Sequence, residues 1–254
     1  MIKKSFYRIK IEGDRLIASF LLDKNLLNKT NKFLHRLILL LKKHKLELIG
    51  IYKNNKKLSN KIGKLTYKNL LIQDNKVFGI YFKGEIGVIK TLSCLNFYNA
   101  GDNYVDLEFI APHFDLIEKH NAKIKEKNLL EFQKIAEGIY TFIQPLYGLI
   151  GQEEFVSSLE DIVQRKKLLP NFWGFYSKKL IDIIGINKFL KILRGSYLIK
   201  NLPDGGVFFA ITDWDSSNSE DISSKKRKRL LLKLIKSRKM TKFIEKELNG
   251  KNEK

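Results

Sequence analysis

Two histidines and an aspartate near the middle of the chain have side chains that can bind a metal ion or move a proton. His113 and Asp115 flank Phe114, and His120 follows five residues after Asp115. In a strand or an extended loop, residues two apart face the same side, so His113 and Asp115 would offer two ligands. The spacing supplies no third strong ligand. We therefore expect ordinary surface or capping residues, and neither a metal site nor a cofactor.

A second group of ligand-type residues begins at Asp213. Asp213, Asp215 and Ser217 alternate as the first ligands of a calcium-binding loop do. Such a loop then requires glycine where Asn218 stands and glutamate where Ser224 stands. Because both requirements fail, we expect a solvated acidic loop.

The remaining reactive residues form no recognisable catalytic set. Gly205 and Gly206 follow Asp204 and precede an apolar run, which is typical of a hairpin turn and not of a phosphate-binding loop. Cys94 lies in an apolar stretch, where a reduced, packed thiol is expected. We expect a protein that is not an enzyme, although a site assembled from scattered residues would leave no local motif.

Aromatic residues gather after Pro170. Trp173 and Tyr176 belong to this cluster, and Trp214 lies in the acidic stretch further on. Interfaces favour tryptophan and tyrosine as anchors, whereas a cluster beneath a helix start is also typical of a core. The residues that we single out for partner binding are Trp173, Tyr176, Asp213, Trp214 and Asp215.

Positive charge gathers at the two ends of the chain. The net charge is +21, with 48 basic and 27 acidic residues, and residues 71–218 are close to neutral. Such flanks attract nucleic acid or an anionic membrane surface without specificity. Lysine greatly outnumbers arginine beside abundant asparagine, isoleucine and leucine, which an AT-rich genome also produces. The candidate patch for an anionic partner is Lys225, Lys226, Arg227, Lys228 and Arg229.

Hydrophobic periodicity predicts strands in blocks with helices between them. We expect strands over residues 4–12, 16–22, 46–52, 77–82, 86–92, 104–110, 147–150, 197–199 and 207–211. We expect helices over residues 25–45, 129–142, 154–165, 177–184, 186–193 and 225–248. Gly84 is expected to separate two central strands, and Gly185 two short helices. This order predicts an α+β fold, with an antiparallel or mixed sheet, helices packed on it and a basic C-terminal helix.

The composition also predicts the domain organisation. We expect a single α+β domain over residues 1–214, which divides by charge into a basic part at 1–70 and a neutral centre at 71–214. The Ser-rich, acidic residues 215–224 would form a linker, and residues 225–254 a basic helix and tail. No apolar stretch approaches the roughly 20 residues that span a bilayer, so we expect no transmembrane segment and a cytoplasmic protein.

Residues 139–212 carry short motifs in an order that resembles a known family. The motifs are Ile143-Gln144-Pro145-Leu146-Tyr147-Gly148, Asn171-Phe172-Trp173-Gly174-Phe175-Tyr176, a short helix over 180–185, and Leu202-Pro203-Asp204-Gly205-Gly206-Val207. The order is similar to the C-terminal part of bacterial polymorphic-toxin immunity proteins of the type called Immunity protein 52. The basic N-terminal region and the Lys-rich tail lie outside this resemblance.

The resemblance implies a non-enzymatic protein that binds a cognate toxin in the cytoplasm and occludes it. Immunity proteins against nucleases are often acidic, and the neutral centre with basic flanks lacks that property, so the toxin need not be a nuclease. Two alternatives stay open. One is a nucleic-acid-associated protein that binds the phosphate backbone through its Lys-rich flanks, and the other is a peripheral membrane protein.

Overall fold

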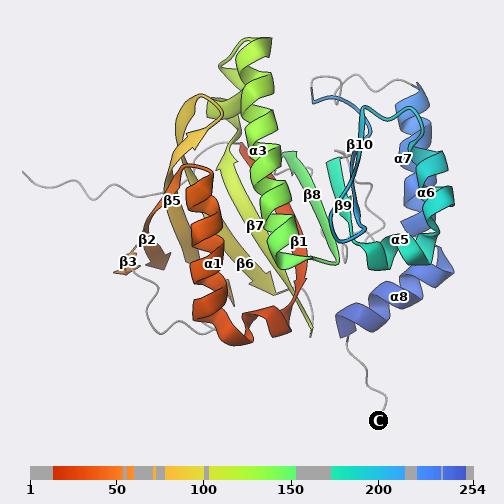
Figure 1. Cartoon of the computed structure of the whole chain (residues 1–254), viewed down its shortest axis with the longest axis horizontal. Coiled ribbons are helices and arrows are strands. Elements are labelled where there is room, and N and C mark those ends of the chain that lie inside the picture. Colours follow the sequence, from red (N-terminus) through yellow and green to blue (C-terminus); the bar gives the residue numbers. More distant parts are fainter. Residues whose placement is uncertain are drawn as a thin grey trace, which may run out of the picture.

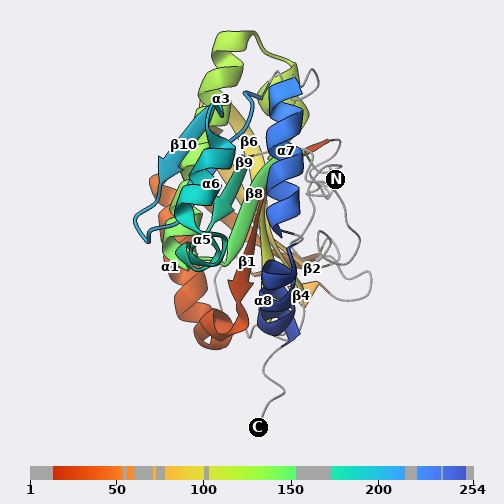
Figure 2. The same cartoon turned by 90° about the vertical axis from the view of Figure 1, so that its right-hand side faces the viewer.

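The computed structural model describes residues 14–53, 56–59, 71–72, 78–99, 103–152, 173–214, 222–235 and 237–249. Within them, helices pack on both faces of one large sheet (Figures 1 and 2). The expected α+β class is therefore confirmed, including a sheet of mixed direction with helices packed on it.

The sheet contains eleven described strands. Their order across the sheet is β10-β11-β9-β8-β1-β7-β6-β5-β2-β3, and β4 pairs with β6 outside this path. The described pairings are antiparallel except that of β4 with β6. The strands are β1 (Arg15–Asp23), β2 (Leu46–Lys53), β3 (Lys56–Ser59), β4 (Leu71–Ile72), β5 (Phe78–Ile86), β6 (Ile89–Asn99), β7 (Tyr104–Pro112), β8 (Tyr147–Gln152), β9 (Trp173–Tyr176), β10 (Leu198–Asn201) and β11 (Val207–Ala210).

Strand β1 lies in the middle of the sheet, between β7 and β8. Every residue from Leu16 to Leu22 is buried. A nearly continuous apolar run of this kind is typical of a strand covered on both faces. The one hydroxyl in the run, that of Ser19, donates a hydrogen bond to the Asp106 carboxylate, which satisfies a polar group that would otherwise be costly to bury.

Two long helices cover one face of the sheet. A 3-10 turn, η1 (Lys24–Lys29), leads into α1 (Thr30–Lys43), and α3 (Ala122–Ile143) lies beside α1 (Figure 1). Their apolar sides meet the sheet in a core that includes Phe20, Leu37, Phe109 and Phe132. No described helix is both long and apolar enough to cross a membrane.

Four further helices pack on the opposite face, over β8, β9 and β11. They are α5 (Lys178–Ile184), α6 (Ile186–Leu193), α7 (Ile222–Ile235) and α8 (Arg238–Asn249). Tyr176, Phe189, Leu231 and Met240 meet in this second core. The C-terminal helices thus dock on the chain's own sheet through their apolar sides (Figure 2).

Some predicted boundaries were wrong. The turn between β5 and β6 lies at Gly87, whose φ is +67°, and not at Gly84. Gly84 lies inside β5, where a Cβ atom would come within 2.0 Å of the Lys45 carbonyl oxygen, so the strand needs a residue without a side chain there. The expected single C-terminal helix is divided in two. Ser237 directly precedes the second helix, α8, and its side-chain oxygen accepts a hydrogen bond from the Met240 N–H at 3.4 Å.

The remaining predictions were confirmed, were shifted along the chain, or lie outside the described residues. Helices α5 and α6 are divided at Gly185, whose φ of +89° suits glycine. The expected first helix begins later than predicted, because residues 24–29 form η1. The expected strand over 4–12 and helix over 154–165 lie outside the described residues, and α7 begins at Ile222, within the expected linker.

The thiol of Cys94 should be unreactive in the folded protein. It is 4% exposed, and its burial, reinforced by the charge of Glu108, raises its pKa to about 12. Since only the thiolate attacks a disulfide reagent, we expect no reaction with DTNB at pH 8 until the chain is unfolded. Because the folded pKa lies above the ordinary value, this group's contribution to stability should be lost as the pH rises from about 9 to about 12. Rapid labelling of native protein at pH 8 would contradict this assignment.

Candidate functional site

The antiparallel pairing of β1 with β7 and β8 brings three strand ends together. The start of β1 lies opposite the ends of both neighbours. Asp14 directly precedes β1, His113 directly follows β7, and Gln152 ends β8. The backbone N–H of His113 donates to the Asp14 carbonyl oxygen at 2.9 Å, which fixes the two chain segments side by side.

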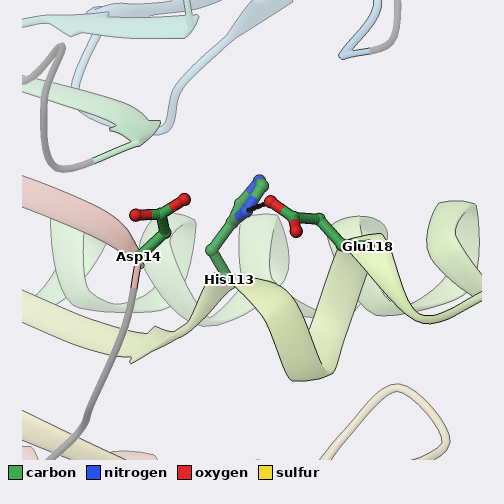
Figure 3. A group of neighbouring side chains, drawn as sticks. All are labelled: Asp14, His113 and Glu118. Atoms are coloured by element: carbon green, nitrogen blue, oxygen red, sulfur yellow. Dashed lines mark hydrogen bonds and ion pairs between the residues drawn. The ribbon is translucent and has the colours of Figure 1, made fainter.

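A single π-helical turn, η2 (Phe114–Glu118), adds a second carboxylate to this end of the sheet. In such a turn, residues five apart in the chain lie one above the other. Oε1 of Glu118 consequently lies 3.0 Å from Nδ1 of His113. Figure 3 shows Asp14, His113 and Glu118 gathered at this place, and we call these three residues the His113 cluster.

His113 is the buried member of the His113 cluster. It is 5% exposed, whereas Asp14 and Glu118 are exposed. Burial lowers the pKa of His113 below its ordinary value, and the neighbouring carboxylates of Glu118 and Asp14 oppose this shift. Within the described part of the chain, its Nε2 has no hydrogen-bond partner.

A cleft of about 540 Å3 opens beside the His113 cluster, which we call the two-tryptophan cleft. It lies between the first half of α3 and the start of β10, and its walls are mostly apolar. The lining residues are Ala122, Lys125, Glu126, Leu129, Leu130, Gln133, Trp173, Tyr197, Leu198, Asp213 and Trp214.

The two tryptophans of the chain pack against each other in this cleft. Their ring centroids are 5.7 Å apart, with the rings perpendicular, a favourable geometry for aromatic pairs. The indole N–H of Trp173 donates to the Thr212 carbonyl oxygen at 3.0 Å, which fixes the segment that carries Trp214. The Trp214 ring also lies 6.0 Å from the His113 ring. Trp214 therefore forms a wall shared by the cleft and the His113 cluster.

The structure brings together three of the five residues that the sequence suggested for partner binding. Trp173, Asp213 and Trp214 all line the two-tryptophan cleft. Tyr176 does not, because alternation along β9 turns it to the opposite face, where it is 1% exposed. Asp215 lies outside the described residues.

The suggested pairing of His113 with Asp115 is wrong. It assumed an extended backbone, whereas residues 113–118 are helical. Asp115 instead forms an ion pair with Lys119 at 2.7 Å, and Nε2 of His120 contacts the Asp115 carbonyl oxygen at 2.8 Å. The sequence did not indicate that the carboxylates of Asp14 and Glu118 lie close to His113. Glu118 could have been found from its five-residue spacing if a π-helical turn had been considered.

The suggested anionic-partner patch lies on α7. Lys225, Lys226 and Arg229 are exposed, and Arg227 is half-buried and donates to the Arg194 carbonyl oxygen at 3.4 Å. The side chain of Lys228 lies outside the described residues. Arg227 therefore contributes to the docking of α7 at the end of α6, whereas its three exposed neighbours face solvent.

Comparisons with known proteins show no family. No family model matches the chain. It is 23% identical over 151 residues to the phosphonates import ATP-binding protein PhnC of Mycoplasma capricolum subsp. capricolum, a match that covers 57% of each chain. The chain thus spans little more than half the length of that relative. Among solved structures, the Pseudomonas aeruginosa T6SS protein PA0821 is similar over 94% of this chain and 82% of its own, with a TM-score of 0.48 and 10% identity. A similarity this low supports no conclusion about function.

The burial of His113 predicts its titration. Because the folded pKa is below the ordinary value of 6.5, this histidine should stay neutral at pH 7. Folded protein should lose stability as the pH falls below about 6.5, since the unfolded chain binds the proton more readily. An NMR titration that follows the ring proton resonances of His113 checks this, with the His113→Gln variant assigning them. A pKa at or above 6.5 would contradict the buried environment.

Proposed function

We propose that this chain is a non-enzymatic, immunity-type binding protein that neutralises a cognate bacterial toxin by occluding it. The observation that carries the proposal is the two-tryptophan cleft. The motifs over residues 139–212 resemble those of immunity proteins, and Trp173, Tyr197 and Leu198 of that segment supply one side of the cleft. Such a cleft fits the aromatic anchoring that is common at protein interfaces.

The side chains that line the cleft suit a protein partner. Two apolar side chains at its mouth are unusually exposed, Tyr197 at 59% and Leu130 at 48%. The tryptophans form an apolar wall, and Lys125 and Glu126 place charges of both signs along the lining. Apolar anchors give affinity, whereas rim charges select among partners.

Strand β10 supports a polypeptide as the occupant. It is an edge strand, because no described strand other than β11 pairs with it. Along an antiparallel edge, alternate residues direct their backbone N–H and C=O groups away from the paired neighbour. A strand of the toxin could therefore extend the sheet at β10 while its side chains enter the adjacent cleft.

Two other functions have weaker support. The relative named above is an ATP-binding protein, but the printed sequence contains no Gly-x-x-x-x-Gly-Lys-Ser/Thr loop, the motif that cradles nucleotide phosphates. Nucleic-acid binding through the Lys-rich flanks rests on exposed charge alone, of which Lys225, Lys226 and Arg229 are described examples. Electrostatic binding of that kind would weaken steeply with salt.

The proposal is tested with any toxin domain that the neighbouring genes encode. We expect co-expression of this chain to protect cells from that domain and the two purified proteins to form a complex. The double variant Leu130→Ala/Tyr197→Ala should weaken the complex by about tenfold or more, because both side chains are exposed anchors at the cleft mouth.

Leu39→Ala is the matched control. Leu39 is exposed to 46%, close to the 48% of Leu130, but lies on α1 and outside the lining of the cleft. It should leave the affinity unchanged. Absence of protection and of a complex would remove the immunity proposal, and equal affinities of the double variant and the control would move the interface away from the cleft. Salt-sensitive binding of DNA or RNA without toxin binding would favour the alternative.

A further inference from the structure

The His113 cluster combines the ligand types that bind divalent transition metals. One imidazole nitrogen and one oxygen from each of two carboxylates lie within 4.8 Å of one another. They come from two segments of the chain, Asp14 directly before β1, and His113 with Glu118 in the helical turn that follows β7. Imidazole with carboxylates suits zinc and neighbouring ions, which accept nitrogen and oxygen donors together.

We propose that Asp14, His113 and Glu118 form a binding site for a divalent transition-metal ion of the zinc class. Nδ1 of His113 is the nitrogen that would bind the ion, because it is the ring atom that faces Glu118. The imidazole proton then resides on Nε2. The site is independent of the toxin-binding proposal, since it rests on different residues.

The geometry needs only small movements to enclose an ion. Donors bound at about 2.0–2.2 Å to a tetrahedral ion lie roughly 3.3 Å apart. Oε1 of Glu118 already lies 3.0 Å from Nδ1 of His113. Asp14 and Glu118 are exposed, so their carboxylates can rotate toward the imidazole, which packing holds in place.

A fourth side chain reaches the same place. The amide nitrogen of Gln152 lies 3.4 Å from Oδ2 of Asp14 and 3.5 Å from Nδ1 of His113. Rotation of the amide exchanges its nitrogen and oxygen, so the oxygen could face the ion. Three strong donors and the Gln152 oxygen would fill the four positions of a tetrahedral ion, and a water or an atom of a partner could take the fourth position in place of Gln152.

A second histidine–carboxylate contact shows what distinguishes the His113 cluster. Nδ1 of His44 lies 3.1 Å from Oε1 of Glu131, almost the same distance as in the cluster. No third ligand-type residue joins that pair among the described residues. The His44–Glu131 pair is therefore an internal control, with nearly the same contact distance and one ligand-type residue fewer.

Calorimetric titration of the full, untagged chain with ZnCl2, MnCl2 and MgCl2 tests the site. We expect one saturable Zn2+ site, with Mg2+ much weaker because it disfavours imidazole. Asp14→Asn and Glu118→Gln should each lower the affinity for Zn2+ by about tenfold or more. Even mutation of a residue that only hydrogen-bonds to a metal ligand lowers the metal affinity about 10–100-fold. Both side chains are exposed, so the variants should fold.

Glu131→Gln is the matched control and should leave the Zn2+ affinity unchanged. Tryptophan fluorescence supplies a second readout, because the Trp214 ring lies 6.0 Å from the His113 ring. Co2+ bound at the site should quench this fluorescence, and Zn2+ should reverse the quenching. Failure of Zn2+ to bind, or equal binding to wild type, Asp14→Asn and Glu118→Gln, would overturn the proposal and leave a hydrogen-bonded cluster only.

Discussion

The double pairing of β1 is the constraint on which the rest of the structure depends. β1 joins β7 on one edge and β8 on the other, and so unites the two halves of the sheet. Its alternate side chains also enter both core regions, because Phe20 packs under the α1–α3 layer whereas Leu21 packs with the C-terminal helices. A break in this strand would therefore disturb both layers of helices at once.

The same pairing places the two proposed sites next to each other. The strand ends at this side of the sheet supply Asp14, His113 and Gln152, and the segment after β11 brings the Trp214 ring close to that of His113. Trp214 also walls the cleft in which we place the toxin. Trp214 therefore lies between the two proposed sites, which otherwise rest on different residues.

Local sequence signals predicted the elements better than the site. Apolar alternation marked the central strands, and Gly185 marked the division between α5 and α6 because a positive φ favours glycine. Whether Gly84 or Gly87 forms the turn could not be predicted, since the answer depends on the carbonyl of Lys45, which directly precedes the neighbouring strand β2. Likewise, the meeting of Asp14 with His113 depends on strand register, which follows from packing over long distances in the chain.

The pairing of β1 with β8 also has a consequence for biosynthesis. Asp14 and Gln152, which meet at that junction, are 138 residues apart in the chain. Ordering such distant segments is slow compared with local helix formation. While the ribosome synthesises the intervening residues, the apolar strand β1 cannot yet pair with β8. An unpaired apolar edge of this kind promotes aggregation. The nascent chain would therefore benefit from a chaperone until β8 has emerged.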